Sequence, residues 1–369
     1  MRKKYILPVL LTLLLLLPAC TTAECPTLSS IPPPESRYSS DAASSASSGM
    51  SSAASAAASS EGAVSSRSPS ASSALPGSSS AVPSSASPSS SVGVTSSQAS
   101  PSSSKAVVLN SSLPPKASPG GTPMPPVTAA MPYASGSSVF SQNGAVIDYS
   151  NSSQGYIMVK YGGSARIKVL VYFNGSSSFY QYNISGGSGY TVLPLQSGSG
   201  TYRVRFMQNV EGSVYAELCS TEISTAVSGA GCTLYPNQYV NYTRSSAAVA
   251  KAASLCAQAT SNSAKVSAIY RFITGNIKYD YAKANSVQSG YLPNVDSTLA
   301  SRKGICFDYS ALMAAMCRSQ GIPTRLVIGT ASVGYHAWNE VYLGGWIRYD
   351  STFGAAGQTV SSYTAEKYY

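Results

Sequence analysis

Cys306 stands at the start of a predicted helix, in the stretch KGICFDYSALMAAMCRSQGIP, where a thiol could act as a nucleophile. Free backbone N–H groups and the positive end of the helix dipole favour a thiolate in the first turn. Position alone is weak evidence, because buried structural cysteines are common. A nucleophilic thiol needs a base, and the chain contains one histidine, His336. If an imidazole activates Cys306, that imidazole belongs to His336.

The second cysteine of the predicted helix, Cys317, is a poor partner for Cys306. Eleven residues of helix rise about 16 Å, whereas the Cα atoms of a disulfide lie within about 7 Å. Both thiols fall on the predicted buried side. That side also carries Tyr309, Leu312, Met313, Met316 and Gln320, and the opposite side carries Asp308, Ala315, Arg318 and Ser319. We interpret Cys317 as a small core residue.

The group that orients the imidazole is sought in the segment YHAWNEVYLGGWIRYD, which predicts two strands joined near Gly344 and Gly345. Glu340 shares the face of His336, but it lies about 13 Å further along the same strand. Asn339 points to the other face of the strand. Neither residue of the first strand can therefore hold the imidazole.

Asp350, on the returning strand, is the better candidate for this role. It shares the face of His336 only if paired residue numbers have an even sum, as when Tyr342 lies opposite Trp346. That register places Asp350 diagonally across from His336, within reach of the ring. A two-residue Gly-Gly turn gives an odd sum, so we expect an odd-numbered loop or a bulge near residues 343–345.

Two helices are predicted before Cys306. TRSSAAVAKAASLCAQAT is Ala-rich and begins with capping residues, and SAKVSAIYRFITGNI places its apolar side chains on one stripe. That stripe consists of Val266, Ile269, Tyr270 and Ile273. The following stretch NSVQSGYLPNVDSTLASRKG is predicted to be a long loop, and such loops in compact domains are usually functional.

Short alternating runs at a spacing of about ten residues predict a small antiparallel β-sandwich over residues 139–230. The runs are GYIMVKY, ARIKVLVYF, SFYQYNI, YTVLPL, TYRVRFMQ and SVYAELCSTEI. Their tyrosines could stack on glycans, although half-buried packing is the more common use of strand tyrosines. Cys219 and Cys232 could form a disulfide in an oxidising compartment, but the pairing of these cysteines and Cys256 stays open.

The first residues resemble a bacterial lipoprotein signal. Basic residues at 2–4 precede an apolar run, and Leu17-Pro18-Ala19-Cys20 resembles a lipobox, which predicts a signal peptide over residues 1–19 and acylation of Cys20. Ordinary cleavage near Ala23 is the alternative. Residues 20–132 are rich in Ser, Ala and Pro and predict a disordered linker after the lipid anchor. The protein is expected outside the cytoplasm, tethered to a bacterial cell membrane.

The formal charge of +10 falls to about +7 when the three basic residues of the signal are removed. The remaining basic residues are scattered, so nucleic-acid binding is not expected. No transmembrane helix is expected after the signal.

KGICFDYSALMAAMCRSQGIPTRLVIG, HAWNEVYLGGW and RYDSTF together resemble the successive motifs of the transglutaminase-like superfamily, which has a papain-like core. The resemblance runs from about residue 240 to 356 and implies an α+β domain over residues 234–369, with a helix packed on an antiparallel sheet. Carried over by position, Cys306 matches the nucleophile, His336 the general base and acid, and Asp350 the orienting residue. Ser351 departs from the proline that many members carry after the Asp.

The resemblance implies acyl transfer through a thioester, with water or a second amine as the acceptor. One oxyanion donor is expected from the Cys306 backbone N–H, and Tyr279 in NIKYDY is the candidate for the second. No cofactor is required, and neither a zinc nor a calcium site has a clear ligand set. The expected partner is a protein or peptide substrate, with cell-wall peptides among the candidates. Two readings remain: a surface thiol peptidase, amidase or crosslinking enzyme, and an inactive wall-associated binding or scaffold protein.

Overall fold

The computed structural model describes residues 121–187 and 189–369. The predicted signal peptide, the predicted acylation site Cys20 and the linker up to residue 120 lie outside the described residues. Within the described part, none of the helices combines the length and apolar character needed to span a membrane.

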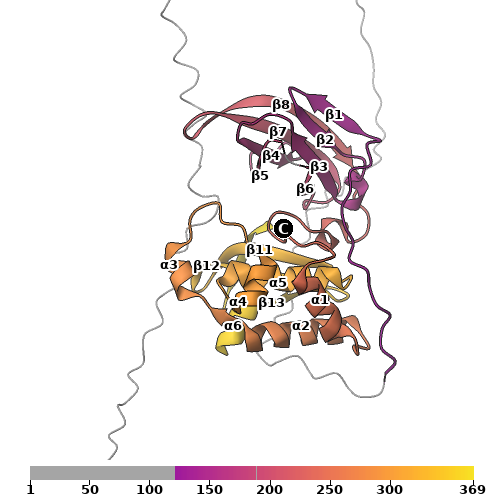
Figure 1. Ribbon diagram of the computed structural model, residues 1–369, viewed down its shortest axis with the longest axis vertical. Coiled ribbons are helices and arrows are strands. Elements are labelled where there is room, and N and C mark those ends of the chain that lie inside the picture. Colours follow the sequence, from indigo (N-terminus) through magenta and orange to yellow (C-terminus); the bar gives the residue numbers. More distant parts are fainter. Residues whose placement is uncertain (1–120, 188) are drawn as a thin grey trace, which may run out of the picture. The chain divides into compact units, whose positions relative to one another are not determined.

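The first half of the described chain forms two antiparallel sheets of four strands each (Figure 1). One sheet has the order β1-β2-β3-β6 and the other the order β5-β4-β7-β8. The strands are β1 (Val139–Gln142), β2 (Ala145–Asp148), β3 (Tyr156–Tyr161), β4 (Ile167–Phe173), β5 (Phe179–Ile184), β6 (Thr191–Pro194), β7 (Gly200–Glu211) and β8 (Val214–Thr225). A 3-10 turn, η1 (Ser152–Gln154), precedes β3. The six runs predicted from alternation coincide with β3 to β8.

β1 and β2 are strands that the alternation did not predict. They form a hairpin in which Gln142 pairs with Ala145 across Asn143 and Gly144, whose φ angles are 52° and 78°. Asn-Gly is the sequence that favours this tight turn, because both positions need positive φ. The hairpin therefore had a local signal, although its strands are only four residues long.

The alternation within the longer strands is confirmed by burial. On β4, Ile167, Val169 and Val171 are buried, and on β7 Tyr202 and Phe206 are buried. Alternate side chains of a strand point to opposite faces, so these residues fill the space on one face of their sheet.

The second half of the described chain combines helices with one antiparallel sheet of the order β13-β12-β11-β14. The helices are α1 (Ala247–Cys256), α2 (Asn262–Asn276), α3 (Tyr281–Ser286), α4 (Val295–Ser301), α5 (Cys306–Ser319) and α6 (Ser351–Ala356). The sheet strands are β11 (Thr324–Ala331), β12 (Gly334–Tyr342), β13 (Trp346–Tyr349) and β14 (Tyr363–Tyr368). A short parallel pair, β9 (Lys278–Tyr279) and β10 (Lys303–Gly304), and the turn η2 (Gly231–Leu234) complete the elements. The helix α5 packs against β11 and β12 (Figure 1).

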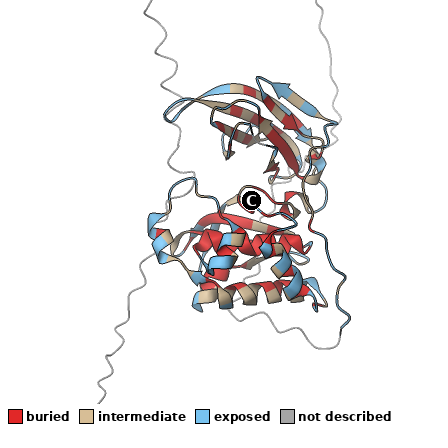
Figure 2. Cartoon of the chain, viewed as in Figure 1, coloured by how far each residue is buried: buried red, intermediate tan, exposed pale blue. Residues whose placement is uncertain are grey.

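The helix α5 is buried on every side, which differs from the two-faced helix predicted from the sequence. Figure 2 shows it buried along its whole length, and Asp308, Arg318 and Ser319 are each fully buried. These three residues were predicted on the side away from the core. The prediction was wrong because it weighed each polar side chain as solvent-facing, whereas hydrogen bonds inside the fold hold all three.

Two further segments differ from their predictions. The predicted long loop after Ser286 contains α4, whose first turn is capped by Asn294 accepting from the N–H of Ser297 at 2.9 Å. The linker ends earlier than residue 132, because Ala129 is buried at 4% exposure and the N–H of Met124 donates to the carbonyl of Ala259. A seven-residue helix and an irregular packed segment leave little periodic signal.

Candidate active site

Cys306 is the first residue of α5, and the chain enters this helix through the short strand β10. Gly304 is needed at the entrance, because a Cβ there would lie 2.6 Å from the Cβ of Asp308. The carboxylate of Asp308 accepts a hydrogen bond of 2.9 Å from the N–H of Ile305, which caps the helix start. This cap fixes the turn that carries the Cys306 thiol.

The buried carboxylate of Asp308 also binds the segment that precedes α4. It accepts from Lys283 Nζ at 2.9 Å and from the Tyr291 hydroxyl at 2.5 Å, and Lys283 Nζ donates to the same hydroxyl at 2.8 Å. Asp308 is fully buried, whereas the Lys283 side chain is 31% exposed. The network therefore ties residues 283–291 to the first turn of α5.

The hairpin of β12 and β13 has the register that the sequence predicted. Tyr342 pairs with Trp346 and Asn339 with Tyr349, so paired numbers have an even sum. The loop between them contains residues 343–345, and Gly344 there adopts φ of 86°, which favours glycine. The predicted odd-numbered loop is therefore confirmed, and it places Asp350 within reach of His336.

His336 and Asp350 are joined by a hydrogen bond of 2.7 Å between Nε2 and Oδ2. The His336 side chain is 0% exposed and that of Asp350 is 9% exposed. The same Oδ2 accepts from the Tyr363 hydroxyl at 2.9 Å, and Oδ1 accepts from the N–H groups of Thr352 and Phe353 at 3.1 Å. Asp350 is therefore held by the first turn of α6 and by β14 while it holds the imidazole.

The other ring nitrogen of His336, Nδ1, is buried and has no hydrogen-bond partner within the described part of the chain. His336 and Cys306 line one small cavity, of about 30 Å³, together with residues from 287–291 and with Tyr335. Burial by itself lowers the pKa of His336, but the Asp350 carboxylate and the adjacent Cys306 outweigh it and raise this pKa to about 10. The surroundings therefore favour the imidazolium form of the ring beside the thiol.

Tyr279, the candidate oxyanion donor, lies close to the first turn of α5. Its strand β9 runs parallel to β10, with Tyr279 paired to Gly304. The phenol oxygen is buried and lacks a hydrogen-bond partner within residues 121–369, position 188 aside. Burial, followed by the charge of Cys306, raises the pKa of Tyr279 far above its usual value. Its hydroxyl is thus a neutral donor near the thiol.

Two residues of this site, Asp308 and Tyr363, were missed from the sequence. Asp308 had a signal, because an acidic residue three positions after the N-cap is typical of a capping box. Tyr363 had none, because its approach to Asp350 depends on β14 adding to the edge of β11. The described cysteines 219, 232, 256, 306 and 317 are all free, so none of them is paired in a disulfide with another.

Comparison with known proteins identifies a family for part of the chain. Residues 249–351 match the family model of the transglutaminase-like superfamily. None of the curated proteins matches the chain.

Several solved structures are similar to the chain at low identity. A candidate cysteine protease from Cytophaga hutchinsonii is 19% identical, with 58% of this chain and 91% of that chain covered and a TM-score of 0.30. The periplasmic domain of TgpA from Pseudomonas aeruginosa is 16% identical, with 63% and 77% covered and a TM-score of 0.29. A transglutaminase from red sea bream is 12% identical, with 56% and 49% covered and a TM-score of 0.23. From the family match, residues 249–351 of this chain form a domain of the transglutaminase-like superfamily.

Proposed function

We propose that the protein is a thiol enzyme that transfers acyl groups from peptide or protein amides through Cys306, His336 and Asp350. One observation carries the proposal. Asp350 binds Nε2 of the buried imidazole at 2.7 Å, which leaves the partnerless Nδ1 as the nitrogen available to the thiol.

The reaction then follows from the roles of the ring nitrogens. The Cys306 thiolate attacks the amide carbonyl carbon, and the resulting tetrahedral oxyanion collapses to a thioester as the C–N bond breaks. The proton on His336 Nδ1 moves to the leaving amine. Nδ1 next accepts a proton from water or a second amine, which attacks the thioester carbonyl, and the thiolate is released. Asp350 keeps the imidazole oriented and stabilises its charged form throughout.

Oxyanion stabilisation is assigned to two donors. The backbone N–H of Cys306 lies in the first turn of α5, where such groups have no intrahelical acceptor. The second donor is the Tyr279 hydroxyl, which is buried and without a partner within the described residues. A preorganised donor of this kind contributes about 3–4 kcal/mol to the transition state.

The small cavity at Cys306 favours the alternative of an inactive scaffold. Its volume of about 30 Å³ has room for about two waters, and Cys306 is 3% exposed. Amide substrates therefore require residues 287–291 or Tyr335 to move aside. Permanent closure of these walls would leave the thiol without substrate.

The proposal includes a location outside the cytoplasm. A lipid anchor at Cys20 and residues 21–120 would hold the domain outside a bacterial cell membrane, where cell-wall peptides and surface proteins are within reach. Nucleic acid has no part in this proposal.

A substrate screen tests the proposal. Casein and peptidoglycan stem peptides are incubated with the enzyme, with and without an added primary amine, and products are read by mass spectrometry. Loss of the amine group with uptake of water indicates hydrolysis, and incorporation of the added amine indicates crosslinking. Iodoacetamide labelling of Cys306 at neutral pH is the companion measurement. A thiol that stays unlabelled together with unchanged substrates would support the inactive scaffold.

A further inference from the structure

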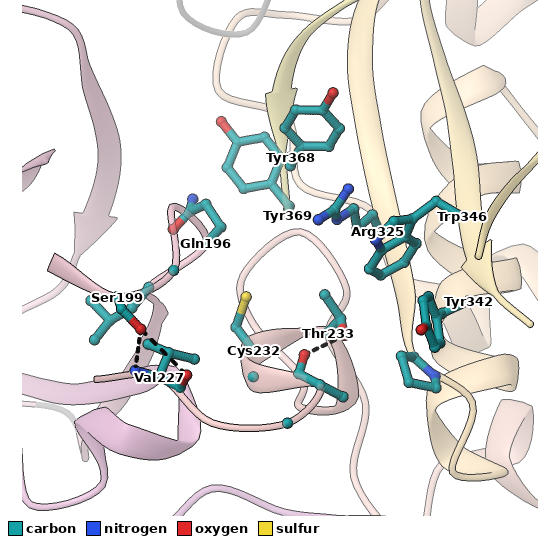
Figure 3. Close-up of a pocket in the computed structure, with 16 residues that line it drawn as sticks. Gln196, Ser199, Val227, Cys232, Thr233, Arg325, Tyr342, Trp346, Tyr368 and Tyr369 are labelled. Carbon is teal, nitrogen blue, oxygen red and sulfur yellow. Dashed lines mark hydrogen bonds between the residues drawn. The ribbon is translucent and has the colours of Figure 1, made fainter. Parts of the chain in front are cut away.

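A second, larger cavity lies outside the candidate active site. Its volume is about 730 Å³, within the range of about 300–1,000 Å³ found for ligand sites. One wall comes from residues 195–199 and 227–233, and the other from the sheet that contains β11 to β14 (Figure 3). On β12 the cavity is lined by Tyr342, six residues or about 20 Å along the strand from His336. Neither Cys306 nor His336 lines it.

The sheet wall is aromatic, and its rings are held in place. The Arg325 guanidinium lies 3.8 Å from the ring centroid of Trp346 and 5.0 Å from that of Tyr368. Tyr342 packs against Trp346 with ring centroids 5.4 Å apart, yet it is 45% exposed. The guanidinium covers one face of Trp346, so the aromatic surface open to the cavity is that of Tyr342 together with the uncovered part of the Trp346 ring.

Among the described residues, the opposite wall has no charged side chain and carries three polar side chains, Gln196, Ser199 and Thr233, among apolar residues and glycines. Gln196 donates through Nε2 to the Tyr182 hydroxyl at 2.8 Å, which leaves its Oε1 as an acceptor. The hydroxyls of Ser199 and Thr233 lie on the same side (Figure 3). Ser199 Oγ accepts from the Val227 N–H at 2.9 Å and Thr233 Oγ1 donates to the Ala230 carbonyl at 2.6 Å, so each has acceptor capacity left. These groups can exchange hydrogen bonds with a ligand that carries hydroxyls.

The charge of the cavity excludes ionic recognition as its main feature. Arg325 is the only charged side chain in the lining, and Glu340 pairs with it at 3.3 Å. Because Glu340 balances the charge of Arg325, the cavity offers little net attraction to an anionic or a cationic ligand. The remaining N–H donors of Arg325 still serve neutral hydroxyl groups.

We propose that this cavity is a saccharide-binding site for pyranose oligosaccharides. A pyranose ring offers a flat face of C–H groups to an aromatic ring, while its hydroxyls both donate and accept hydrogen bonds at its edge. The lining pairs these two needs, with Trp346 and Tyr342 on one wall and Gln196 and Ser199 on the other. The site is independent of the thiol chemistry.

Titration with cellotetraose, maltotetraose and N-acetylchitotetraose tests the proposal on the full chain, up to about 10 mM, by calorimetry and by tryptophan fluorescence. The chain has two tryptophans, and Trp338 is 1% exposed, so a saccharide-induced change reports on Trp346. We expect at least one of the probes to bind saturably with a Kd of about 1 mM or tighter.

The variants Trp346→Ala and Tyr342→Ala should each weaken binding about tenfold, and Trp346→Phe should retain part of it. Tyr342 is exposed, so its variant tests the site even if Trp346→Ala fails to fold. Tyr133→Ala, at a side chain that is 56% exposed and outside the cavity lining, is the matched control and should bind normally. Cys306→Ala should also bind normally.

Absence of saturable binding by all three probes would overturn the proposal. Unchanged binding in both Trp346→Ala and Tyr342→Ala would also overturn it, because the saccharide would then sit elsewhere. Aromatic surfaces also bind Pro-rich peptides. If the saccharides do not bind and a peptide covering residues 113–126 changes the Trp346 fluorescence saturably, the ligand of the cavity is a peptide and not a saccharide.

Discussion

The two cysteines of α5 differ in their surroundings. Cys306 lies in the first helical turn beside His336, whereas Cys317 is fully buried, and burial raises the pKa of its thiol to about 12. Cys306→Ala should abolish turnover, because among the described residues that line the cavity Cys306 is the one thiol that can form the thioester. Cys317→Ala should leave kcat unchanged and lower the free energy of unfolding by about 1 kcal/mol. Steady-state kinetics and urea unfolding measure both effects. Wild-type turnover by Cys306→Ala would show that the thiol mechanism is wrong.

The pH dependence of the thiol follows from the charge on His336. Burial lowers its pKa, but the Asp350 carboxylate and Cys306 raise it to about 10, above the ordinary value near 6.5. The raised pKa of His336 therefore favours the imidazolium, and a cation beside a thiol makes that thiol more reactive. Asp350→Asn removes the strongest favourable charge, so the ring loses its proton at lower pH. Iodoacetamide labelling of Cys306 at pH 6, relative to pH 9, should fall in this variant.

Asn is the informative replacement at position 350, because Asp350 also caps α6. Its Oδ1 accepts from the N–H groups of Thr352 and Phe353, a role that the Asn carbonyl oxygen can keep. Asp350→Ala loses the cap as well, at a cost of about 1 kcal/mol. If Asp350→Asn has a normal Tm and the ratio of the labelling rate at pH 6 to that at pH 9 does not change, then Asp350 does not set the charge of His336.

Tyr363 is expected to position Asp350 without touching the substrate. Its hydroxyl donates to Oδ2 at 2.9 Å, the same oxygen that binds the imidazole. Tyr363→Phe keeps the ring and deletes this bond, so kcat should fall about threefold to tenfold with KM nearly unchanged. Tyr335→Phe, a change at a half-buried tyrosine that lines the cavity and forms no hydrogen bond with Asp350 within the described part of the chain, serves as the comparison. A KM effect alone would indicate that Tyr363 acts on substrate access.

At the scale of elements, Asp308 couples α5 to the segment before α4. Asp308→Ala leaves the Ile305 N–H and the Tyr291 hydroxyl without their acceptor and Lys283 without its carboxylate. We expect a loss of about 2–4 kcal/mol in the free energy of unfolding. Lys283→Met, at a side chain that is 31% exposed, should cost less than Asp308→Ala. Chemical unfolding compares the two, and equal costs would place the energy in the ion pair and not in the buried hydrogen bonds.

The elements that position the site were predictable to an unequal degree. The start of α5 and its end near Gly321 follow from local signals, and the β12–β13 register follows from requiring His336 and Asp350 on one face. The partners of Asp308 were not predictable, because Lys283 and Tyr291 reach it only after α3 and the following loop fold over the helix. In contrast, β3 to β8 were predictable, because the alternation of side chains within a strand is a local signal that needs no knowledge of distant contacts.

At the scale of the whole described chain, Arg318 shows what a single sequence conceals. It is fully buried on α5 and donates to the carbonyls of Thr324, Tyr235 and Tyr369, at 2.8, 2.7 and 2.6 Å. The last two acceptors are 83 and 51 residues away. A helix-period analysis places such an arginine towards solvent, because acceptors that are distant in sequence are invisible to it.

The segment before β1 gives a prediction about the whole molecule. Residues 121–132 were predicted as linker, yet Arg244 Nε donates to the carbonyl of Ala129 at 3.2 Å and Met124 N–H to that of Ala259 at 2.9 Å. A chain that begins at residue 133 should therefore melt below one that begins at residue 121. Two hydrogen bonds and the buried Ala129 contribute about 1–2 kcal/mol, which corresponds to about 2–8 °C in Tm.

Differential scanning calorimetry of the two shortened chains measures this difference. Both chains keep the candidate active site and the saccharide cavity intact in sequence, so kinetic and binding measurements serve as controls for correct folding. Equal Tm values would show that the contacts of residues 121–132 add nothing to stability. A lower Tm for the chain beginning at residue 133 would show that residues 121–132 belong to the folded part, because only this segment separates the two chains.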